Sequence, residues 1–377
     1  MGLIAGVLKE TFPGERRVAI VPRVVELISK AGAELWIEPD AGAEAGFPDS
    51  EYASKGAHLA ASAAQVLEKA GILLQVRPPA AGRLSRQHTV IAFCDPLNEP
   101  QISDEIAKSG ATLFSMEFIP RITRAQSMDA LSSMATVAGY KAVLLAANAL
   151  PRMFPMLMTA AGTVPPARAF VMGAGVAGLQ AISTARRLGA VVSAYDVRPA
   201  VKEQIESLGA KFVSMALDTA NAEGAGGYAK AADEDFYRRQ RELTASVLKD
   251  QDVVITTAAI PGRKAPVLIT REMLTAMAPG SVIVDLAAER GGNCEATQPG
   301  ETVVVEGVTV IGPLNLPSSV PYHASQMYAR NVAALLKHLI KDGQLNIDLN
   351  DEITRETLVA RDGAIVHPKV QQLLTAA

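Results

Sequence analysis

Short apolar runs alternate with amphipathic stretches throughout the first 120 residues. Runs rich in Val, Ile and Leu that end at turn residues predict β-strands, and apolar residues at three- and four-residue spacing predict helices. The expected strands are Leu3–Val7, Glu34–Ile37, Ile72–Val76, Thr89–Cys94 and Ala111–Glu117, with helices at Arg23–Ala31, Ser62–Ala70 and Gln101–Ser109. Because parallel neighbours need long crossovers, helices between strands predict a doubly wound α/β domain.

A second series of the same kind begins near residue 169. It predicts strands at Ala169–Met172, Val191–Tyr195, Lys211–Ser214, Asp252–Thr257 and Ser281–Leu286, helices at Val176–Leu188, Ala200–Leu208 and Arg271–Met277, and a hairpin over Thr302–Ile311 turning at Glu306 and Gly307. The alternation again indicates a parallel sheet covered by helices. We therefore expect two Rossmann-like α/β domains.

Two long helical stretches connect these series. One covers Ala135–Met158, which we expect to break near Pro151, and the other covers Ser325–Leu339. The second is long enough to return the chain to the first domain, and we expect the C-terminal tail to complete that domain. The predicted domains are therefore 1–134 with 325–377, and 135–324.

Composition excludes several classes of function. The chain has 377 residues, 36 basic and 39 acidic, and a net charge of −3, so it carries no electrostatic footprint for nucleic acid or an anionic membrane. Its two cysteines, Cys94 and Cys294, form no metal-ligand or disulfide pattern, which favours a reducing cytoplasm and predicts no metal site. No export signal is evident, and prolines and polar residues interrupt the apolar stretch Ala142–Met158, so no membrane span is expected.

The sharpest local motif is glycine-rich and lies between a predicted strand and a predicted helix. Gly173 permits the turn, Gly175 lets a pyrophosphate approach the backbone, and Gly178 lets helix pack closely on strand. Asp196 ends the next strand 23 residues after Gly173, where a carboxylate accepts both hydroxyls of an adenine ribose. Since that carboxylate repels a 2′-phosphate, we expect NAD(H) rather than NADP(H), with Arg198 stacking on adenine or serving as a solvated charge.

The sequence offers little acid–base machinery beside this motif. None of the five histidines, His58, His88, His323, His338 and His367, lies next to it, and no nucleophile motif accompanies it. A hydride passing directly between two nicotinamide rings needs positioning but no proton donor. The missing groups therefore favour direct hydride transfer.

A polar loop follows the last strand of the first series. The run from Pro120 to Ser133, Pro-Arg-Ile-Thr-Arg-Ala-Gln-Ser-Met-Asp-Ala-Leu-Ser-Ser, followed by Ala138-Gly139-Tyr140-Lys141, resembles the signature loop of the NAD(H)-binding component, domain I, of proton-translocating nicotinamide nucleotide transhydrogenase. The resemblance covers nearly the whole chain. It includes the stretches 9–19, 159–167, Asp196-Val197-Arg198, 226–230, 256–262 and 284–295.

This resemblance implies roles for individual residues. Arg121, Gln126, Asp129 and Ser132 match the loop that orients the nicotinamide and contacts the incoming NADP nucleotide, with Ile122 and Thr123 in its walls. The pyrophosphate would lie at Ala174, Gly175 and Val176, and the adenosine near Asp196, Val197, Arg198 and Ala259. Further family contacts map to Gly227 and Gln240, and Tyr228 lies on a glycine-rich loop, Asn221–Ala232, that would close over the nucleotide.

The resemblance also implies partners. NADP(H) would lie on a second component, and proton translocation would be performed by a membrane-spanning component. The chain itself would form a homodimer, with the hairpin Thr302–Ile311 as a candidate contact. It would be peripheral, on the cytoplasmic face of the inner membrane, as a separate subunit.

Two other functions remain open. An alanine or other amino-acid dehydrogenase would share the fold, with Arg17 at the substrate carboxylate. That family, however, has a catalytic lysine where Gln75 stands, a histidine near Asp95 and an aspartate near Glu289. A non-catalytic NAD(H)-sensing module is the second alternative.

Overall fold

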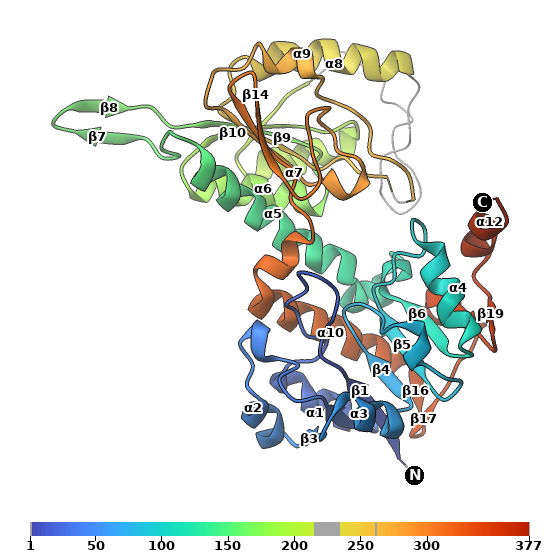
Figure 1. Ribbon diagram of the computed structural model, residues 1–377. Helices are drawn as coiled ribbons and strands as arrows, with labels where there is room; N and C mark the ends of the chain where they lie inside the picture. Colours follow the sequence, from blue (N-terminus) through green and yellow to red (C-terminus); the bar gives the residue numbers. More distant parts are fainter. Residues whose placement is uncertain (1, 215–233, 261, 377) are drawn as a thin grey trace. The chain divides into compact units, whose positions relative to one another are not determined.

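The protein folds into two compact α/β units. The computed structural model describes residues 2–214, 234–260 and 262–376 (Figure 1). Unit 1 consists of Met1–Met134 together with Pro317–Ala377, and unit 2 of Ala135–Leu316. Each unit has one large sheet, mostly of parallel strands, with helices on its faces. The expected class, two doubly wound α/β domains, is confirmed.

Unit 1 has an eight-stranded sheet in the order β19-β18-β6-β5-β4-β1-β2-β3. The six strands from the first half of the chain are mutually parallel, whereas β18 and β19 are antiparallel additions from the C-terminal segment. The strands are β1 Leu3–Val7, β2 Ala33–Ile37, β3 His58–Leu59, β4 Ile72–Leu74, β5 Thr89–Ala92, β6 Thr112–Ser115, β18 Leu358–Arg361 and β19 Ala364–Ile365. The C-terminal segment therefore extends this sheet at one edge.

Helices cover both faces of this sheet. Val66 of α3, Ile106 of α4 and Val370 of α12 join one buried core with Leu73 and Val90 of the sheet. On α10, the Tyr328 ring lies 5.0 Å from that of Phe93, and its hydroxyl donates to the Gln75 carbonyl at 2.7 Å. The helices of this unit are α1 Pro22–Lys30, α2 Asp49–Ser54, α3 Ala63–Lys69, α4 Pro100–Lys108, α10 Pro321–Leu339, α11 Glu352–Thr357 and α12 Pro368–Ala376.

Unit 2 has a seven-stranded sheet in the order β11-β10-β9-β12-β13-β15-β14, in which β14 alone is antiparallel to its neighbour. The strands are β9 Arg168–Met172, β10 Val191–Tyr195, β11 Lys211–Phe212, β12 Val253–Thr256, β13 Val282–Asp285, β14 Thr302–Val305 and β15 Val308–Ile311. Its helices are α6 Val176–Arg187, α7 Lys202–Ser207, α8 Glu234–Leu248 and α9 Arg271–Leu274, together with most of α5 Ala130–Ala149.

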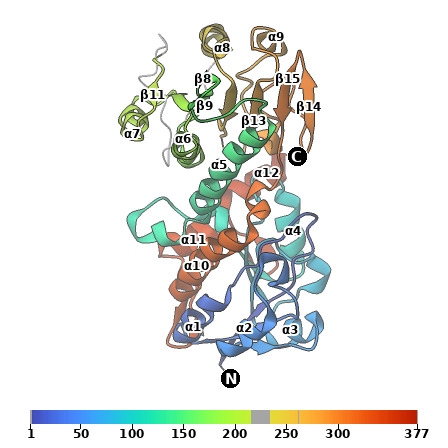
Figure 2. The ribbon, with the colours of Figure 1, turned by 90° about the vertical axis from the view of Figure 1, so that its left-hand side faces the viewer.

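Successive residues of one strand lie in two different cores, one on each face of this sheet. Ala169 and Val171 point into a core shared with Ala181 and Ile182 of α6. Phe170 and Met172, one position on, point into a second core on the other face. Successive side chains of a strand face opposite ways, so a strand buried on both faces is an unbroken apolar run. Figure 2 shows α6 on one side of these strands and α8 and α9 on the other.

The connector breaks near Pro151 as expected, but the part after the break is not helical. Helix α5 begins at Ala130 and ends at Ala149, before Pro151, and the chain then forms a hairpin of β7 Leu157–Thr159 and β8 Gly162–Val164. The hairpin projects from unit 2 (Figure 1). Its Met- and Ala-rich sequence carries no alternation, because both faces are largely exposed. Likewise α10 begins at Pro321, four residues earlier than expected.

Helix α5 is the one helix in the described ranges that is long and apolar enough to cross a membrane by length and composition. Its residues Ala142, Val143 and Ala146 are fully buried in a core of unit 2. Gly139 lets α5 approach α6, since a Cβ there would lie 2.1 Å from the Ala177 carbonyl oxygen.

Acid should destabilise the C-terminal part of unit 1 through His367. This side chain is buried, and its ring stacks on Phe118 with 4.3 Å between centroids. Burial lowers the pKa of His367 below 6.5, with Glu356 opposing and Lys369 adding to the shift. The unfolded chain therefore binds more protons as pH falls through 6.5, and the free energy of unfolding falls by at most about 1.4 kcal/mol per pH unit.

Urea unfolding between pH 7.5 and 5 measures this loss. His367→Phe, which keeps the ring stack, should have a weaker pH dependence than the wild type. His58→Gln, at an exposed histidine of the same unit, should keep the wild-type dependence. Equal slopes for His367→Phe and the wild type would contradict the assignment.

Candidate functional site

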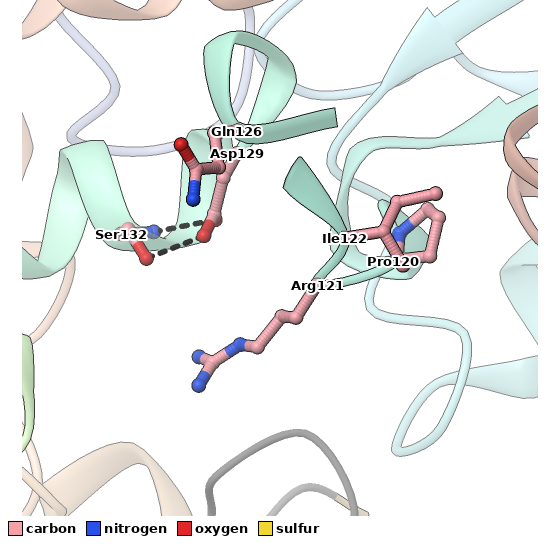
Figure 3. A pocket seen from close by; sticks show the side chains of 6 residues that line it. All are labelled: Pro120, Arg121, Ile122, Gln126, Asp129 and Ser132. Carbon is pink, nitrogen blue, oxygen red and sulfur yellow. Dashed lines mark hydrogen bonds between the residues drawn. The ribbon is translucent and has the colours of Figure 1, made fainter. Parts of the chain in front are cut away.

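A pocket of about 230 Å³ lies in the loop after β6. Its lining is Pro120, Arg121, Ile122, Gln126, Asp129 and Ser132, all from unit 1. In Figure 3, Gln126, Asp129 and Ser132 lie together, and the Arg121 guanidinium extends into the space beside them. The loop begins at the carboxyl end of a parallel strand, where open α/β sheets place ligand sites. Four of the residues expected to act on the nicotinamide are therefore brought together.

Asp129 and Ser132 form one hydrogen-bonded unit. The Asp129 carboxylate accepts the Ser132 N–H at 2.8 Å and the Ser132 hydroxyl at 2.5 Å. The first of these bonds satisfies an N–H group at the start of α5, as an N-cap does. Asp129 is therefore fixed against the helix and holds the Ser132 hydroxyl in one orientation.

Distant segments of the chain hold this loop in place. Ala125 and Met128 are buried, and the Asn331 amide of α10 donates to the Ser127 carbonyl at 2.8 Å. Arg124 donates to Asp351 at 2.5 Å. Asn331 and Asp351 were not predicted from the sequence, since they lie more than 200 residues from the loop and carry no local signature.

Asp351 is a junction of three groups. It caps α11 by accepting the Thr354 N–H at 3.1 Å, and it contacts Nε2 of His338 at 2.9 Å. Partial burial opposes its ionisation, but the Thr354 N–H, Arg124 and His338 together lower the pKa of Asp351 to about 2. It therefore stays charged at neutral pH, and the ion pair that anchors the loop persists.

In the glycine turn of unit 2, the fold requires glycine at two positions but not at the third. Gly173 has a φ of 97°, and a Cβ on Gly178 would lie 1.8 Å from the Gly173 carbonyl oxygen, so a side chain fits at neither position. At Gly175, φ is −73°, and no described atom lies within 4 Å of an added Cβ. Packing among the described residues of unit 2 therefore does not demand glycine at position 175.

The N-terminus of α6 completes this turn. Gly175 is its N-cap, and no side chain of the described residues caps it. The first N–H groups of a helix have no partner within the helix and attract anions. Open space at Gly175 and uncapped N–H groups beside it, including that of Val176, are suited to a pyrophosphate.

Asp196 is buried and accepts four hydrogen bonds. Three come from Arg198, through its backbone N–H at 2.8 Å, Nε at 2.9 Å and an Nη at 2.8 Å, and one comes from the Ala174 N–H at 2.7 Å. Of the two roles expected for Arg198, the solvated charge is wrong, since the side chain is 13% exposed and paired, and stacking on adenine stays a prediction. The Ala174 N–H is directed to Asp196 and not toward a phosphate.

The other residues expected to contact the nucleotide differ in how far they are buried. Gln240 of α8 is buried, whereas Ala259, after β12, is exposed. Val197 is half-buried against the core that contains Tyr195. Thr123 begins the short 3₁₀ segment Thr123–Met128 of the pocket loop. Gly227, Tyr228 and the loop Asn221–Ala232 lie outside the described residues. Within the described ranges, no three His, Cys, Asp or Glu side chains gather as metal ligands.

Comparison with known proteins covers nearly the entire chain. Residues 6–138 match the family model "Alanine dehydrogenase/PNT, N-terminal domain", and residues 142–368 match "Alanine dehydrogenase/PNT, C-terminal domain". The chain belongs to the alanine dehydrogenase/PNT family. Both halves of the chain, and so both α/β units, are covered by its two models.

Within this family, transhydrogenases are more similar to the chain than an alanine dehydrogenase is. The chain is 48% identical to the first part of the NAD(P) transhydrogenase alpha subunit of Rhodospirillum rubrum, over 96% of this chain and 97% of the relative. A crystal structure of transhydrogenase from Sinorhizobium meliloti has a TM-score of 0.85 and 45% identity, over 97% of this chain and 99% of that one. Alanine dehydrogenase of Mycobacterium tuberculosis is 28% identical, over 97% and 95%. The resemblance to transhydrogenases found in the sequence is confirmed.

The two glycines give a matched test of the turn. Gly175→Ala should leave thermal stability within a few degrees of the wild type, because no described atom obstructs the added methyl group. It should weaken NADH binding about tenfold or more, since the methyl group occupies the approach to the turn. Gly178→Ala should instead destabilise unit 2 strongly through the clash with Gly173.

Thermal unfolding and NADH fluorescence titration of both variants measure the two effects. Gly82→Ala is the control, at a glycine of unit 1 with similarly open surroundings. It should change neither quantity. Wild-type NADH affinity in Gly175→Ala would show that no ligand approaches this turn.

Proposed function

We propose that this chain is the NAD(H)-binding catalytic component of a proton-translocating transhydrogenase. The observation that carries the proposal is the chemistry of the pocket after β6. Its six lining residues supply a guanidinium, an amide, a carboxylate and a hydroxyl, but no His, Lys, Cys or Tyr. Such a lining binds and orients a polar ring. Its one carboxylate, that of Asp129, is held by two hydrogen bonds from Ser132.

NAD(H) fits the residues of unit 2. The open backbone at Gly175 and the N-terminus of α6 receive the pyrophosphate, and Asp196 receives the ribose hydroxyls. Because the four hydrogen bonds to Asp196 use its acceptor positions, the Arg198 side chain must turn away for the ribose to bind there. A negative charge at this position also disfavours the 2′-phosphate of NADP(H).

The pocket residues act by positioning. When bound, NADH supplies a hydride that passes from C4 of its ring to C4 of NADP⁺ held by the partner component. Gln126 provides both an amide donor and an acceptor for a carboxamide, and Arg121 provides charge for a phosphate of the incoming nucleotide. Asp129 orients the Ser132 hydroxyl, so that Ser132 presents its oxygen as an acceptor. Tyr228 and Gly227 would contribute from the loop that covers the nucleotide.

An amino-acid dehydrogenase is the alternative, and the contacts of Arg17 disfavour it. The Arg17 side chain is 2% exposed, and its Nε and Nη2 donate to Glu15 at 2.7 and 2.6 Å. Gln75 is also buried, with its amide paired to the Leu8 backbone at 2.9 and 3.4 Å. A guanidinium already paired with a carboxylate in the chain is poorly placed to receive a substrate carboxylate.

A homodimer belongs to the proposal, together with NADP(H)-binding and membrane components that hold the chain on the cytoplasmic face of the membrane. The hairpin of β7 and β8 supports self-association, because Met158 is 78% exposed and Met156 and Val164 lie exposed beside it. Apolar side chains on a projecting hairpin are typical of an interface. The hairpin Thr302–Ile311 is the competing surface, where Val304 on the edge strand β14 is 69% exposed.

Gln126→Asn tests the catalytic role. Shortening the amide by one methylene should slow hydride transfer about tenfold or more while leaving the Kd for NADH nearly unchanged, because the amide orients the ring and contributes little to binding. The assay mixes the chain with the NADP(H)-binding component and follows reduction of an NAD analogue by NADPH. Gln101→Asn, the same change at an exposed position of α4, should have wild-type rates.

Three outcomes would count against this role. A large loss of NADH affinity in Gln126→Asn would show that its amide binds and does not orient. No turnover by the wild type with stoichiometric partner would favour a sensing module. NADH production from NAD⁺ and alanine without a partner would establish the amino-acid dehydrogenase.

The dimer surface has its own test. Met158→Asp should convert a dimer into a monomer in sedimentation equilibrium, because the interface would bury an unpaired carboxylate. Val304→Asp, the same kind of change on the other apolar surface, should leave the dimer intact. The reverse result would assign the contact to Thr302–Ile311.

A further inference from the structure

The segment Asp285–Thr297 contains a buried polar network to which the proposed function gives no role. The Asp285 side chain, at the end of β13, is fully buried and accepts five hydrogen bonds. Oδ1 accepts the Thr256 hydroxyl at 2.9 Å and the Ala287 N–H at 3.0 Å. Oδ2 accepts the Asn293 and Cys294 N–H groups at 2.7 and 3.1 Å and the Thr297 hydroxyl at 2.7 Å. Burial of a carboxylate is tolerated only with such compensation.

The double glycine of this segment lets the chain wrap around Asp285. Gly291 and Gly292 have φ values of 91° and 81°, which favour glycine. A Cβ on Gly292 would lie 2.9 Å from Oδ2 of Asp285 and 2.9 Å from Cβ of Thr297. The glycines therefore allow the backbone to approach the Asp285 carboxylate closely. The hydrogen bond from the Asn293 N–H to that carboxylate then fixes the position of Asn293.

Asn293 carries the network to the strand next to the glycine turn. Its side chain is fully buried, and Oδ1 accepts the Ala258 N–H at 3.0 Å. Nδ2 donates to the carbonyls of Ala258 and Pro266, both at 2.8 Å. One amide thus pairs with both backbone groups of Ala258, which lies beyond the last residue of β12.

Thr257 connects the same loop to the glycine turn. Its hydroxyl donates to the Gly173 carbonyl at 3.0 Å and contacts the Met172 carbonyl at 3.3 Å, and its N–H donates to the latter at 2.8 Å. Residues 257 and 258 are therefore held by the turn on one side and by Asn293 on the other. The exposed Ala259 follows directly.

We propose that Asn293, fixed by Asp285, is a positioning residue for NAD(H). Asn293 holds Ala258, and Ala258 in turn fixes the position of Ala259. The distance between Ala259 and the glycine turn is then the one that the adenosine half of the nucleotide requires. Thr257 holds the same loop to the glycine turn through its bond to the Gly173 carbonyl. The inference rests on the proposed binding of NAD(H) at this turn. It assigns a function to the segment Arg290–Cys294, Arg-Gly-Gly-Asn-Cys.

The test measures NADH affinity of the full chain without a partner, by fluorescence titration, beside thermal unfolding. Asn293→Ala removes three side-chain hydrogen bonds to the loop and should raise the Kd for NADH about tenfold or more. Thr257→Val removes the bond to Gly173 at nearly constant volume and should raise the Kd about fivefold. Thr257→Ser restores the hydroxyl and should return the Kd to near the wild-type value.

Ser281→Ala is the matched control. Ser281 is also fully buried in unit 2, and its hydroxyl donates to the Gln251 carbonyl at 3.2 Å, a bond outside the network. This variant should lose stability and keep its affinity. If Asn293→Ala fails to fold, the Thr257→Val and Thr257→Ser pair decides.

Two results would overturn the inference, and they are distinguishable. Lower stability with wild-type affinity in Asn293→Ala and Thr257→Val would make the network purely structural, and NAD(H) binding would stand. No NADH binding by the wild type would overturn the proposed function and the inference together.

Discussion

The close approach of α6 to the end of β9 is the contact on which the architecture of unit 2 depends. The Gly178 Cα lies so near the Gly173 carbonyl that no side chain fits between them. The N-terminus of α6 thus lies at the carboxyl end of β9, where the Ala174 nitrogen is 2.7 Å from a carboxylate oxygen of Asp196, the residue after β10. On the other side of α6, Gly139 allows the connecting helix α5 to pack equally closely. Two adjacent residues of α6, Ala177 and Gly178, thus make the close contacts that fix α5 and the glycine turn.

Local spacing explains which residues of the site were predictable. The glycine turn and Asp196 are separated by one helix and one strand, so their sequence spacing is a consequence of the βαβ unit and is visible without a structure. The supports of the pocket loop obey no such rule. Asn331 and Asp351 reach Ser127 and Arg124 only because the C-terminal segment returns to unit 1. Tertiary contacts of that kind leave no periodic trace in the sequence.

The wrong predictions have physical causes as well. Met, Leu and Ala are good helix formers, so propensity favours helix again between the break expected near Pro151 and Met158. The break is observed, since α5 ends at Ala149, but the chain then continues as an exposed hairpin. Arg198 is not the solvated charge that was one of its two expected roles, because its position two residues after Asp196 lets it fold back on that carboxylate. An ion pair between residues two positions apart thus competes with the contact to a ligand that a motif indicates.

The order of strands in unit 2 shows why one edge of the sheet gathers so many polar contacts. Strands β10, β9, β12 and β13 are neighbours, and the residues at or just after their carboxyl ends are Asp196, Gly173, Thr257 and Asp285. The chain order reverses between β9 and β12, which is the position where doubly wound sheets bind ligands. There the Thr257 hydroxyl adds a bond to Gly173 beyond the paired strands β9 and β12, and Asn293, held by Asp285, bonds Ala258. The sheet topology brings these polar groups to one edge, and in the proposed site the three side chains set the spacing between the glycine turn and Ala259.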